Sequence, residues 1–333
     1  MSSGSGNVLA QQVIKGDRGA LAKAITLVES VAEGRLQEGQ DLLETLLPKA
    51  GAGIRYGITG IPGSGKSTLI EALGLHLIGL GHRVAVLAVD PSSTRSGGSI
   101  LGDKTRMEKL AVNDAAFVRP SATGGALGGV TRRTREATVL CEAAGYDRVI
   151  IETVGVGQNE LAVERMTDLN IVLMLAGTGD ELQGIKRGIM ESADVVVLNK
   201  YDGANRKACE RARNELQHAI QLMPSRANGR RPDVLLCSAL EGTGIAELAD
   251  HMERSIAEDR SSGAFAQRRW AQWTDWLDHA IGDGLHTAFA HDALVNEARN
   301  AYAGKVASGH LSPAKAAAEL IALFRTGGAP PRG

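Results

Sequence analysis

A phosphate-binding loop is the feature that most limits what this chain can fold into. Residues 60–67 read Gly-Ile-Pro-Gly-Ser-Gly-Lys-Ser and complete the pattern G-x-x-x-x-G-K-S/T. An apolar run at 54–59 precedes the loop and a helical pattern of apolar residues follows it. A strand before and a helix after are the context that this loop needs to bind phosphate. An ordinary glycine turn is the alternative, and this context disfavours it.

In such a loop, backbone N–H groups point into one concavity and the helix start adds the positive end of its dipole. Lys66 is expected to reach the β- and γ-phosphates, and the Ser67 hydroxyl is expected to bind Mg²⁺. The chain is therefore predicted to bind a nucleoside triphosphate. The predicted phosphate-binding residues are Gly60, Gly63, Ser64, Gly65, Lys66, Ser67 and Thr68.

The base specificity is predicted by Asn199-Lys200-Tyr201-Asp202, which follows an apolar run. An ionised Asp202 only accepts hydrogen bonds, so it suits the N1–H and amino donors of guanine and leaves adenine poorly satisfied. Asn199 would contact the base edge and hold neighbouring loops, while the stem of Lys200 would cover a face of the base. Asn and Asp are also common at any boundary between a strand and a loop. After a phosphate loop and at a strand end, they favour GTP and GDP.

A second loop supports the guanine site. It reads Ser238-Ala239-Leu240, and its backbone N–H would meet the guanine oxygen.

Acidic residues at the ends of two further apolar runs are candidate magnesium ligands. Asp90 follows the run at 84–89, and Glu152 follows the run at 148–151. The carboxyl ends of parallel strands meet at the ligand crevice, so both carboxylates are expected there. Glu152 and Gly155 occupy the first and last positions of a D-x-x-G motif, which senses a γ-phosphate, and glutamate replaces the usual aspartate. The glutamate side chain is longer, so Glu152 would contact Mg²⁺ either directly or through a water molecule.

Asp103, in the loop at 96–105, is a further candidate for the magnesium environment. For each of these acids, a helix cap or a solvated loop charge is the alternative. The expected catalytic residues are Lys66, Glu152 and Asp103.

The composition excludes several classes. The net charge of −1 gives no field to steer nucleic acid or anionic lipid, and the apolar runs are interrupted before membrane-spanning length. We therefore expect no nucleic acid and no membrane as partners. Cys141, Cys209 and Cys237 are far apart, which indicates neither a disulfide scaffold nor a zinc site. The first residues lack a signal peptide, which favours the cytoplasm.

Three regions are expected: a helical extension at 1–52, a nucleotide-binding domain at 53–260, and a helical region at 261–333 that ends in a disordered tail. Helical patterns alternate with apolar runs at 54–59, 84–89, 115–118, 148–152, 170–176, 194–199 and 233–237. This alternation predicts an α/β P-loop NTPase fold, with a mostly parallel, doubly wound sheet flanked by amino- and carboxyl-terminal helical extensions.

All three tryptophans lie close together after residue 261, at Trp270, Trp273 and Trp276, near Phe265. Such a concentration requires a buried surface. Packing onto the flank of the nucleotide-binding domain and a dimer arm are the two interpretations.

Three longer segments carry a resemblance to a known family. Residues 89–107 read Val-Asp-Pro-Ser-Ser-Thr-Arg-Ser-Gly-Gly-Ser-Ile-Leu-Gly-Asp-Lys-Thr-Arg-Met, residues 119–129 read Arg-Pro-Ser-Ala-Thr-Gly-Gly-Ala-Leu-Gly-Gly, and residues 152–160 read Glu-Thr-Val-Gly-Val-Gly-Gln-Asn-Glu. With these motifs the chain resembles the MeaB/ArgK/MMAA family of G proteins over nearly its whole length. The resemblance implies a Mg²⁺-dependent GTPase that gates adenosylcobalamin loading, protection and reactivation of an acyl-CoA mutase, methylmalonyl-CoA mutase or a close relative.

The resemblance also implies roles for particular residues. It assigns Lys66 and Ser67 to phosphate and Mg²⁺, Asp90, Asp103 and Glu152 to the magnesium environment, and Asn199 and Asp202 to guanine. The segment 177–188 is similar to the family's third switch, in which Gln183 and Lys186 would relay the nucleotide state to the mutase. An ordinary loop with a solvated charge is the alternative there. Family members are homodimers through carboxyl-terminal helices, which favours the dimer arm.

Two other kinds of GTPase remain as alternatives. A nickel-insertion GTPase needs Cys or His ligands at its loops, and the eight histidines are scattered without ligand spacing. A protein-targeting GTPase needs a methionine-rich helical module, which seven dispersed methionines do not supply. The identity of the mutase cannot be read from the sequence.

Overall fold

The computed structural model describes residues 3–30, 33–89, 107–121, 127–153, 163–176, 190, 192–223, 225 and 230–327. Its contacts divide the chain into two compact units, residues 1–272 and 273–333. Within the described ranges, no helix is long and apolar enough to cross a membrane. The three-part division of the chain at residues 52 and 260 stays a prediction.

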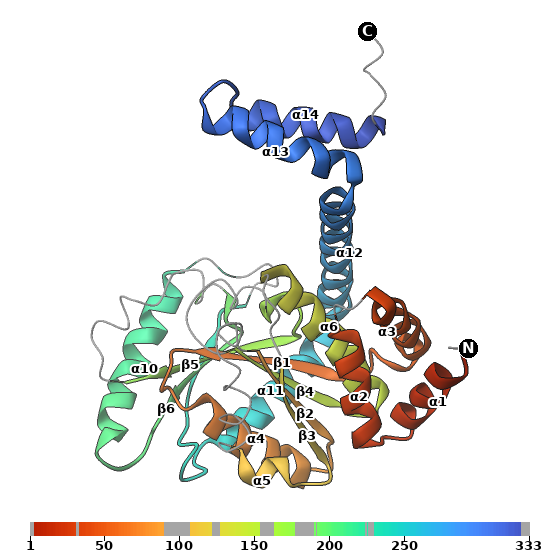
Figure 1. The fold of residues 1–333 in the computed structure, drawn as a ribbon. Helices are drawn as coiled ribbons and strands as arrows, with labels where there is room; N and C mark the ends of the chain where they lie inside the picture. The colour runs from red at the N-terminus through yellow and green to blue at the C-terminus, as the bar shows by residue number, and fades with distance from the viewer. Residues whose placement is uncertain are drawn as a thin grey trace. The chain divides into compact units, whose positions relative to one another are not determined.

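A seven-stranded sheet forms the centre of the first unit (Figure 1). Its order is β3-β2-β4-β1-β5-β6-β7, and every neighbouring pair is parallel. The strands are β1 (Ile54–Gly60), β2 (Val84–Val89), β3 (Ala116–Ser121), β4 (Arg148–Thr153), β5 (Leu169–Leu175), β6 (Val195–Asn199) and β7 (Asp233–Leu236). All seven expected strands are present, which confirms the α/β fold with a doubly wound parallel sheet.

Only β3 continues well past its predicted end at residue 118. It includes Pro120, which has no N–H to donate and interrupts a strand pattern in the sequence. Because β3 is an edge strand of this sheet, one side of its backbone needs no partner and the proline is tolerated.

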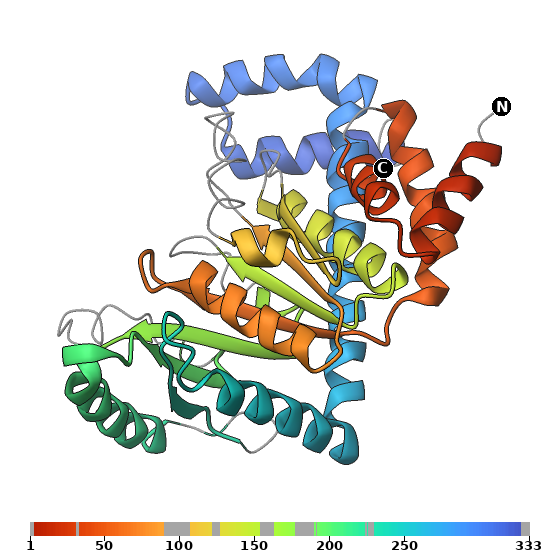
Figure 2. The same cartoon turned by 90° about the horizontal axis from the view of Figure 1, so that it is seen from below.

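Helices cover both faces of the sheet (Figures 1 and 2). In β2, Val84 and Val86 lie in one core, whereas Ala85 and Leu87 lie in the core on the opposite face. The first core is closed by α4 (Lys66–Gly79), α5 (Glu108–Ala111) and α11 (Ile245–Ser262), and the opposite face by α6 (Leu127–Ala143) and α10 (Arg206–Gln221). Strands buried on both faces read as continuous apolar runs, which explains why the sequence revealed them.

Three helices precede β1: α1 (Ser3–Ile14), α2 (Arg18–Val28) and α3 (Glu33–Leu46). Their apolar side chains share one buried cluster with α6 and β2. A polar contact also ties them to the sheet, because the Arg119 guanidinium of β3 lies 2.6 Å from the Glu29 carboxylate at the end of α2. The amino-terminal helices therefore form a layer on the sheet.

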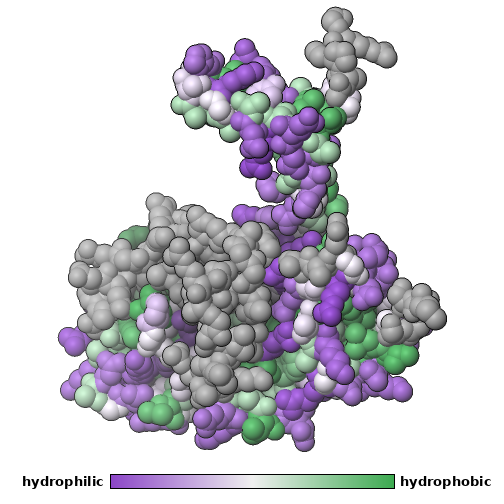
Figure 3. Space-filling model, viewed as in Figure 1, coloured by the Kyte–Doolittle hydropathy of each residue, from purple (hydrophilic) through white to green (hydrophobic). Residues whose placement is uncertain are grey.

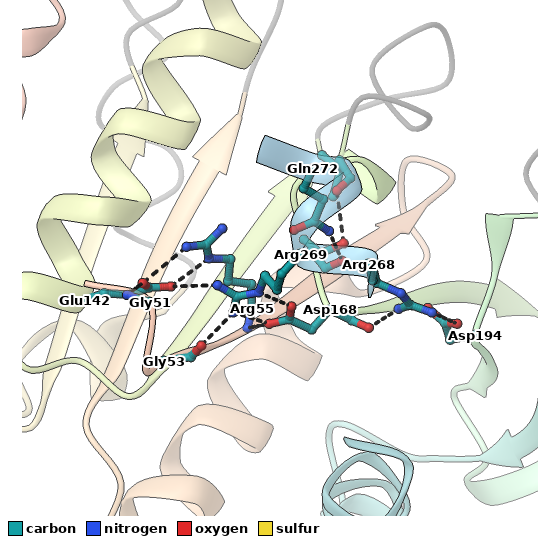
Figure 4. Close-up of polar contacts among 11 residues, drawn as sticks. Gly51, Gly53, Arg55, Glu142, Asp168, Asp194, Arg268, Arg269 and Gln272 are labelled. Atoms are coloured by element: carbon teal, nitrogen blue, oxygen red, sulfur yellow. Dashed lines mark hydrogen bonds and ion pairs between the residues drawn. The ribbon is translucent and has the colours of Figure 1, made fainter. Parts of the chain in front are cut away.

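The first turns of α12 (Ala264–His291) are fastened to the sheet by buried charges (Figure 4). Arg269 Nη2 donates to Asp168 Oδ2 at 2.6 Å and to the Gly53 carbonyl at 2.7 Å. Arg268 pairs with Asp194 at 3.1 Å, and Gln272 Nε2 donates to the Thr167 carbonyl at 2.7 Å. These acceptors lie just before β1, β5 and β6, so residues 264–272 of α12 are held at the amino-terminal edge of the strands.

The second unit contains the remainder of α12, α13 (Ala293–Ala307) and α14 (Pro313–Thr326). Asp292 and Ser312 cap the last two helices, and Phe289 contacts Phe324 edge to face with ring centroids 5.5 Å apart. Val295 and Ala316 are the only residues in its described part that are buried. This unit thus has little core of its own.

An apolar stripe on α12 is left exposed. Trp273, Leu277, Ile281 and Leu285 follow one another at a spacing of four residues, and their exposed fractions are 39%, 60%, 51% and 59%. Figure 3 shows green hydrophobic residues among purple ones in α12 and the helices after it. Trp273 stacks on Trp276 with ring centroids 5.1 Å apart, while Trp270 is 70% exposed. Most of the Trp270 side chain is thus exposed, whereas Phe265 packs against the sheet's core.

Candidate functional site

The loop between β1 and α4 adopts a conformation that its glycines make possible. Gly60, Gly63 and Gly65 have φ angles of 152°, 81° and 90°. A Cβ atom on Gly60 would lie 2.3 Å from the Leu173 carbonyl oxygen of the neighbouring strand β5. Positive φ and close backbone approach are conditions that favour glycine, so the glycine spacing of the motif has a direct structural cause.

Lys66 begins α4 and its side chain lies inside this loop. The ammonium Nζ donates to the carbonyl oxygens of Gly60 at 2.8 Å and Ile61 at 3.1 Å, and Lys66 is buried. Ser64 is also buried and its hydroxyl donates to the Ile61 carbonyl at 2.8 Å, whereas Thr68 is exposed in the first turn of α4. A cation held at the centre of a phosphate loop is positioned to stabilise negative charge there.

Ser67 and Glu152, two predicted metal ligands, lie together. The Ser67 hydroxyl donates to Glu152 Oε1 at 3.2 Å. Glu152 is buried in β4, directly beside β1, where it is the register partner of Ile58. A hydroxyl and a carboxylate at the phosphate edge are hard oxygen donors of the kind that Mg²⁺ prefers, so this donor pair fits a magnesium ion.

Five other predicted residues cannot be compared with these positions. Asp90, Asp103, Gly155, Gln183 and Lys186 lie outside the described residues.

Asn199 connects the phosphate loop to the predicted base-binding loops. It ends β6, and its Nδ2 donates to the Ser64 carbonyl at 2.8 Å. Its Oδ1 accepts the Ala239 backbone N–H at 3.2 Å. Lys200, the next residue, has a φ of 59°, a left-handed conformation that is uncommon outside glycine. One buried amide therefore holds together three segments that are distant in sequence.

Asp202 and Ser238 also lie in contact. The Ser238 hydroxyl donates to Asp202 Oδ2 at 2.6 Å and accepts the Glu241 backbone N–H at 3.1 Å. Leu240 is 84% exposed beside them. The loop closes tightly after Leu240, because a Cβ on Gly244 would lie 2.2 Å from the Leu236 carbonyl oxygen. The structure thus brings the two predicted base-binding loops together and fixes the direction of the Asp202 carboxylate.

Two buried thiols, those of Cys209 and Cys237, lie next to these loops. Burial raises the pKa of Cys209 and raises that of Cys237 to about 12, so both thiols are protonated at neutral pH. The hydrogen bond from the Tyr201 hydroxyl to Glu210 raises the pKa of that tyrosine. A thiolate is the nucleophilic form of cysteine, and burial disfavours that form at both positions.

Sequence reasoning missed a pair of threonines at the same edge of the sheet. The buried Thr153 hydroxyl donates to the Thr59 hydroxyl at 2.9 Å, which joins the ends of β4 and β1. The sequence contains a signal for both threonines, because each is a polar residue at the end of an apolar run and next to a motif.

Residues 21–293 match the family model described as "Methylmalonyl Co-A mutase-associated GTPase MeaB". A probable GTPase of Mycobacterium tuberculosis is 53% identical over 315 residues, with 95% of this chain and 94% of that protein covered. The "Methylmalonic aciduria type A homolog, mitochondrial" of Mus musculus is 44% identical, with 94% of this chain and 78% of that protein covered.

A solved structure agrees with these sequence matches. The crystal structure described as "LAO/AO transport system kinase" is 36% identical, with a TM-score of 0.76 and coverage of 98% of this chain and 99% of the other. The family model spans most of the chain, the relatives are similar over almost all of it, and the phosphate loop adopts the expected geometry. The chain therefore belongs to the MeaB family of GTPases.

Proposed function

We propose that this GTPase gates the loading, protection and reactivation of adenosylcobalamin in an acyl-CoA mutase, methylmalonyl-CoA mutase or a close relative. The match of residues 21–293 to a family described as mutase-associated is the observation that carries the proposal. The mouse relative, named for methylmalonic aciduria, supports the same class of partner. In the cycle that we propose, GTP and GDP states differ in their affinity for the mutase.

Guanine recognition is proposed for Asn199, Lys200 and Asp202, together with the loop 238–240. Two contacts support it, because Asn199 joins the phosphate loop to Ala239 and the Ser238 hydroxyl orients Asp202. An oriented carboxylate can accept both guanine donors at once.

A bound Mg²⁺ would neutralise charge on the β- and γ-phosphates. Ser67 and Glu152 are the described residues that would hold it, and Asp90 and Asp103 are proposed to join them. Lys66 would stabilise the charge that develops during in-line attack of water on the γ-phosphate. Lys66→Ala is expected to abolish hydrolysis, measured as phosphate release.

Intrinsic hydrolysis is proposed to be slow. The residue after Gly155 is Val156, which cannot orient a water molecule, and Gln158 is a weaker candidate for that role. Rapid hydrolysis by the isolated protein would count against this proposal.

The segment 177–188 is proposed to relay the nucleotide state to the mutase. It follows β5, whose end lies at the same sheet edge as the ends of β1 and β6. Replacing Gln183 and Lys186 by Ala should leave basal hydrolysis nearly intact and lower the mutase-stimulated rate. Equal loss of both rates would place these residues in catalysis, and no loss would make the segment an ordinary loop.

A homodimer through the carboxyl-terminal helices is also proposed. The exposed apolar stripe of Trp273, Leu277, Ile281 and Leu285 supports it, because such spacing puts one apolar face on a helix. A unit with only two buried residues in its described part gains a core by pairing with a second copy.

GTPases for nickel insertion or protein targeting remain the alternatives. Affinity purification of the tagged protein from its own cells separates the three, since a mutase, a nickel-enzyme apoprotein or ribosomes would co-purify. Recovery of a mutase in a nucleotide-dependent manner supports the proposal, and recovery of either other partner without a mutase contradicts it. The cytoplasmic location stays a prediction.

A further inference from the structure

Arg206 and Glu241 connect the two loops proposed to bind guanine. Arg206 is the first residue of α10, four positions after Asp202, and Glu241 directly follows Leu240. Their side chains form an ion pair, with Arg206 Nη2 3.2 Å from Glu241 Oε2. Both side chains are about half-exposed, at 49% and 46%, so the pair spans the surface between the loops.

The same guanidinium also contacts the base-specificity motif itself. Its central carbon lies 5.3 Å from the centroid of the Tyr201 ring, a cation–π distance. Tyr201 is held from two sides, because its hydroxyl donates to Glu210 at 3.0 Å and its backbone N–H donates to the Cys237 carbonyl at 2.9 Å. Arg206 therefore lies against a fixed ring on one loop and pairs with a carboxylate on the other.

Arg206 lies near the start of a helical segment, because the 3₁₀ turn Gly203–Asn205 leads directly into α10. A cation by itself opposes the helix dipole at such a position. The carboxylate of Glu241 offsets this charge while it joins the two loops.

We propose that Arg206 and Glu241 are positioning residues that hold the two guanine-binding loops together and slow nucleotide release. The inference rests on the base site proposed above. Among the residues that the structure describes, the pair contacts no part of the phosphate site, so it is proposed to act on how long the base stays bound and to leave the chemistry of hydrolysis unchanged.

The test measures release of a fluorescent GDP analogue by stopped flow from the full-length protein. Arg206→Ala and Glu241→Ala should each speed release about two- to fivefold, the effect of an exposed ion pair. The double variant should release no faster than the faster single variant, because both changes break the same contact. Arg213→Ala, which removes another exposed arginine from α10, is the matched control and should match the wild type.

The direction of the two effects separates a contact from a general electrostatic field. A field effect would make Arg206→Ala weaken and Glu241→Ala strengthen retention of the anionic nucleotide. A contact makes both variants release faster. Arg206→Lys, which keeps a cation near Glu241, should restore slow release in part.

The melting temperature of Arg206→Ala and GDP binding by Asp202→Ala distinguish failure of this inference from failure of the proposed base site. Arg206→Ala should change the melting temperature little, since an exposed ion pair stabilises a fold by at most about 1 kcal/mol. Opposite effects of the single variants, or release no faster than in Arg213→Ala, would overturn the role of the pair. Asp202→Ala, measured alongside, must weaken GDP binding; if it does not, the base site itself is wrong and the inference falls with it.

Discussion

A Cβ atom on Gly65 would lie 2.5 Å from Nδ2 of Asn199. The same nitrogen donates to the Ser64 carbonyl, so the phosphate loop and the end of β6 are in direct contact. Room for that contact exists only because residue 65 has no side chain. The two halves of the proposed nucleotide site therefore depend on each other through one amide group.

Gly65→Ala is expected to lower GTP affinity by about tenfold or more, because backbone strain and the collision with Asn199 act together. Isothermal titration measures the loss. Gly63→Ala is the matched control: Gly63 has a similar φ of 81° but an added Cβ there would meet no atom within 4 Å. Equal losses in the two variants would show that the contact with Asn199 is irrelevant. In an Asn199→Ala background, the additional loss from Gly65→Ala should shrink.

Asp202→Asn is expected to weaken GTP and to favour xanthosine triphosphate. The new amide can donate to the 2-oxo group of xanthine, where the carboxylate could only accept. Titration of both nucleotides against the wild type and the variant checks this. Unchanged GTP affinity in the variant would remove Asp202 from the base site.

Arg269→Ala is expected to lower the free energy of unfolding by about 3–5 kcal/mol, because it leaves the buried Asp168 carboxylate without its charged partner and with the Arg55 backbone N–H as a neutral donor. Urea denaturation followed by circular dichroism gives the difference. The exposed Arg213→Ala should change it by less than about 0.5 kcal/mol. A loss for Arg269→Ala as small as that of the control would mean that the ion pair does not fasten α12.

Ile281→Glu is expected to turn the proposed dimer into a monomer, since it puts a charge in the middle of the apolar stripe on α12. Light scattering after size exclusion reports the mass. Thr287→Glu adds the same charge to the same helix at an exposed position outside the stripe and should leave the dimer intact. A wild-type protein that is already monomeric contradicts the dimer arm.

The sequence predicts the sheet and the phosphate loop well because both depend on local patterns. Strands buried on both faces give apolar runs, and the loop's glycines are required by backbone angles at Gly60, Gly63 and Gly65. The role predicted for Asn199 in holding neighbouring loops is visible in its contacts with Ser64 and Ala239.

Other features could not be predicted, because they depend on residues that are distant in sequence. Asp168 and Arg269 are 101 positions apart, and each alone looks like a solvated surface charge. Arg206 and Glu241 are 35 positions apart, on loops whose closeness only the folded sheet creates.

We propose above that GTP hydrolysis by this protein is linked to an acyl-CoA mutase. The most direct measurement compares the rate of phosphate release from GTP for the isolated protein with the rate in the presence of a saturating amount of the cognate mutase, with Lys66→Ala as the blank. We predict slow release alone and faster release with the mutase. We also predict that the mutase binds the GTP and GDP states with different affinities, and linkage then requires that it change the relative affinity of the protein for the two nucleotides by the same factor. The same rate with and without the mutase, together with equal affinity of the mutase for both states, would contradict a link between the GTPase and the mutase.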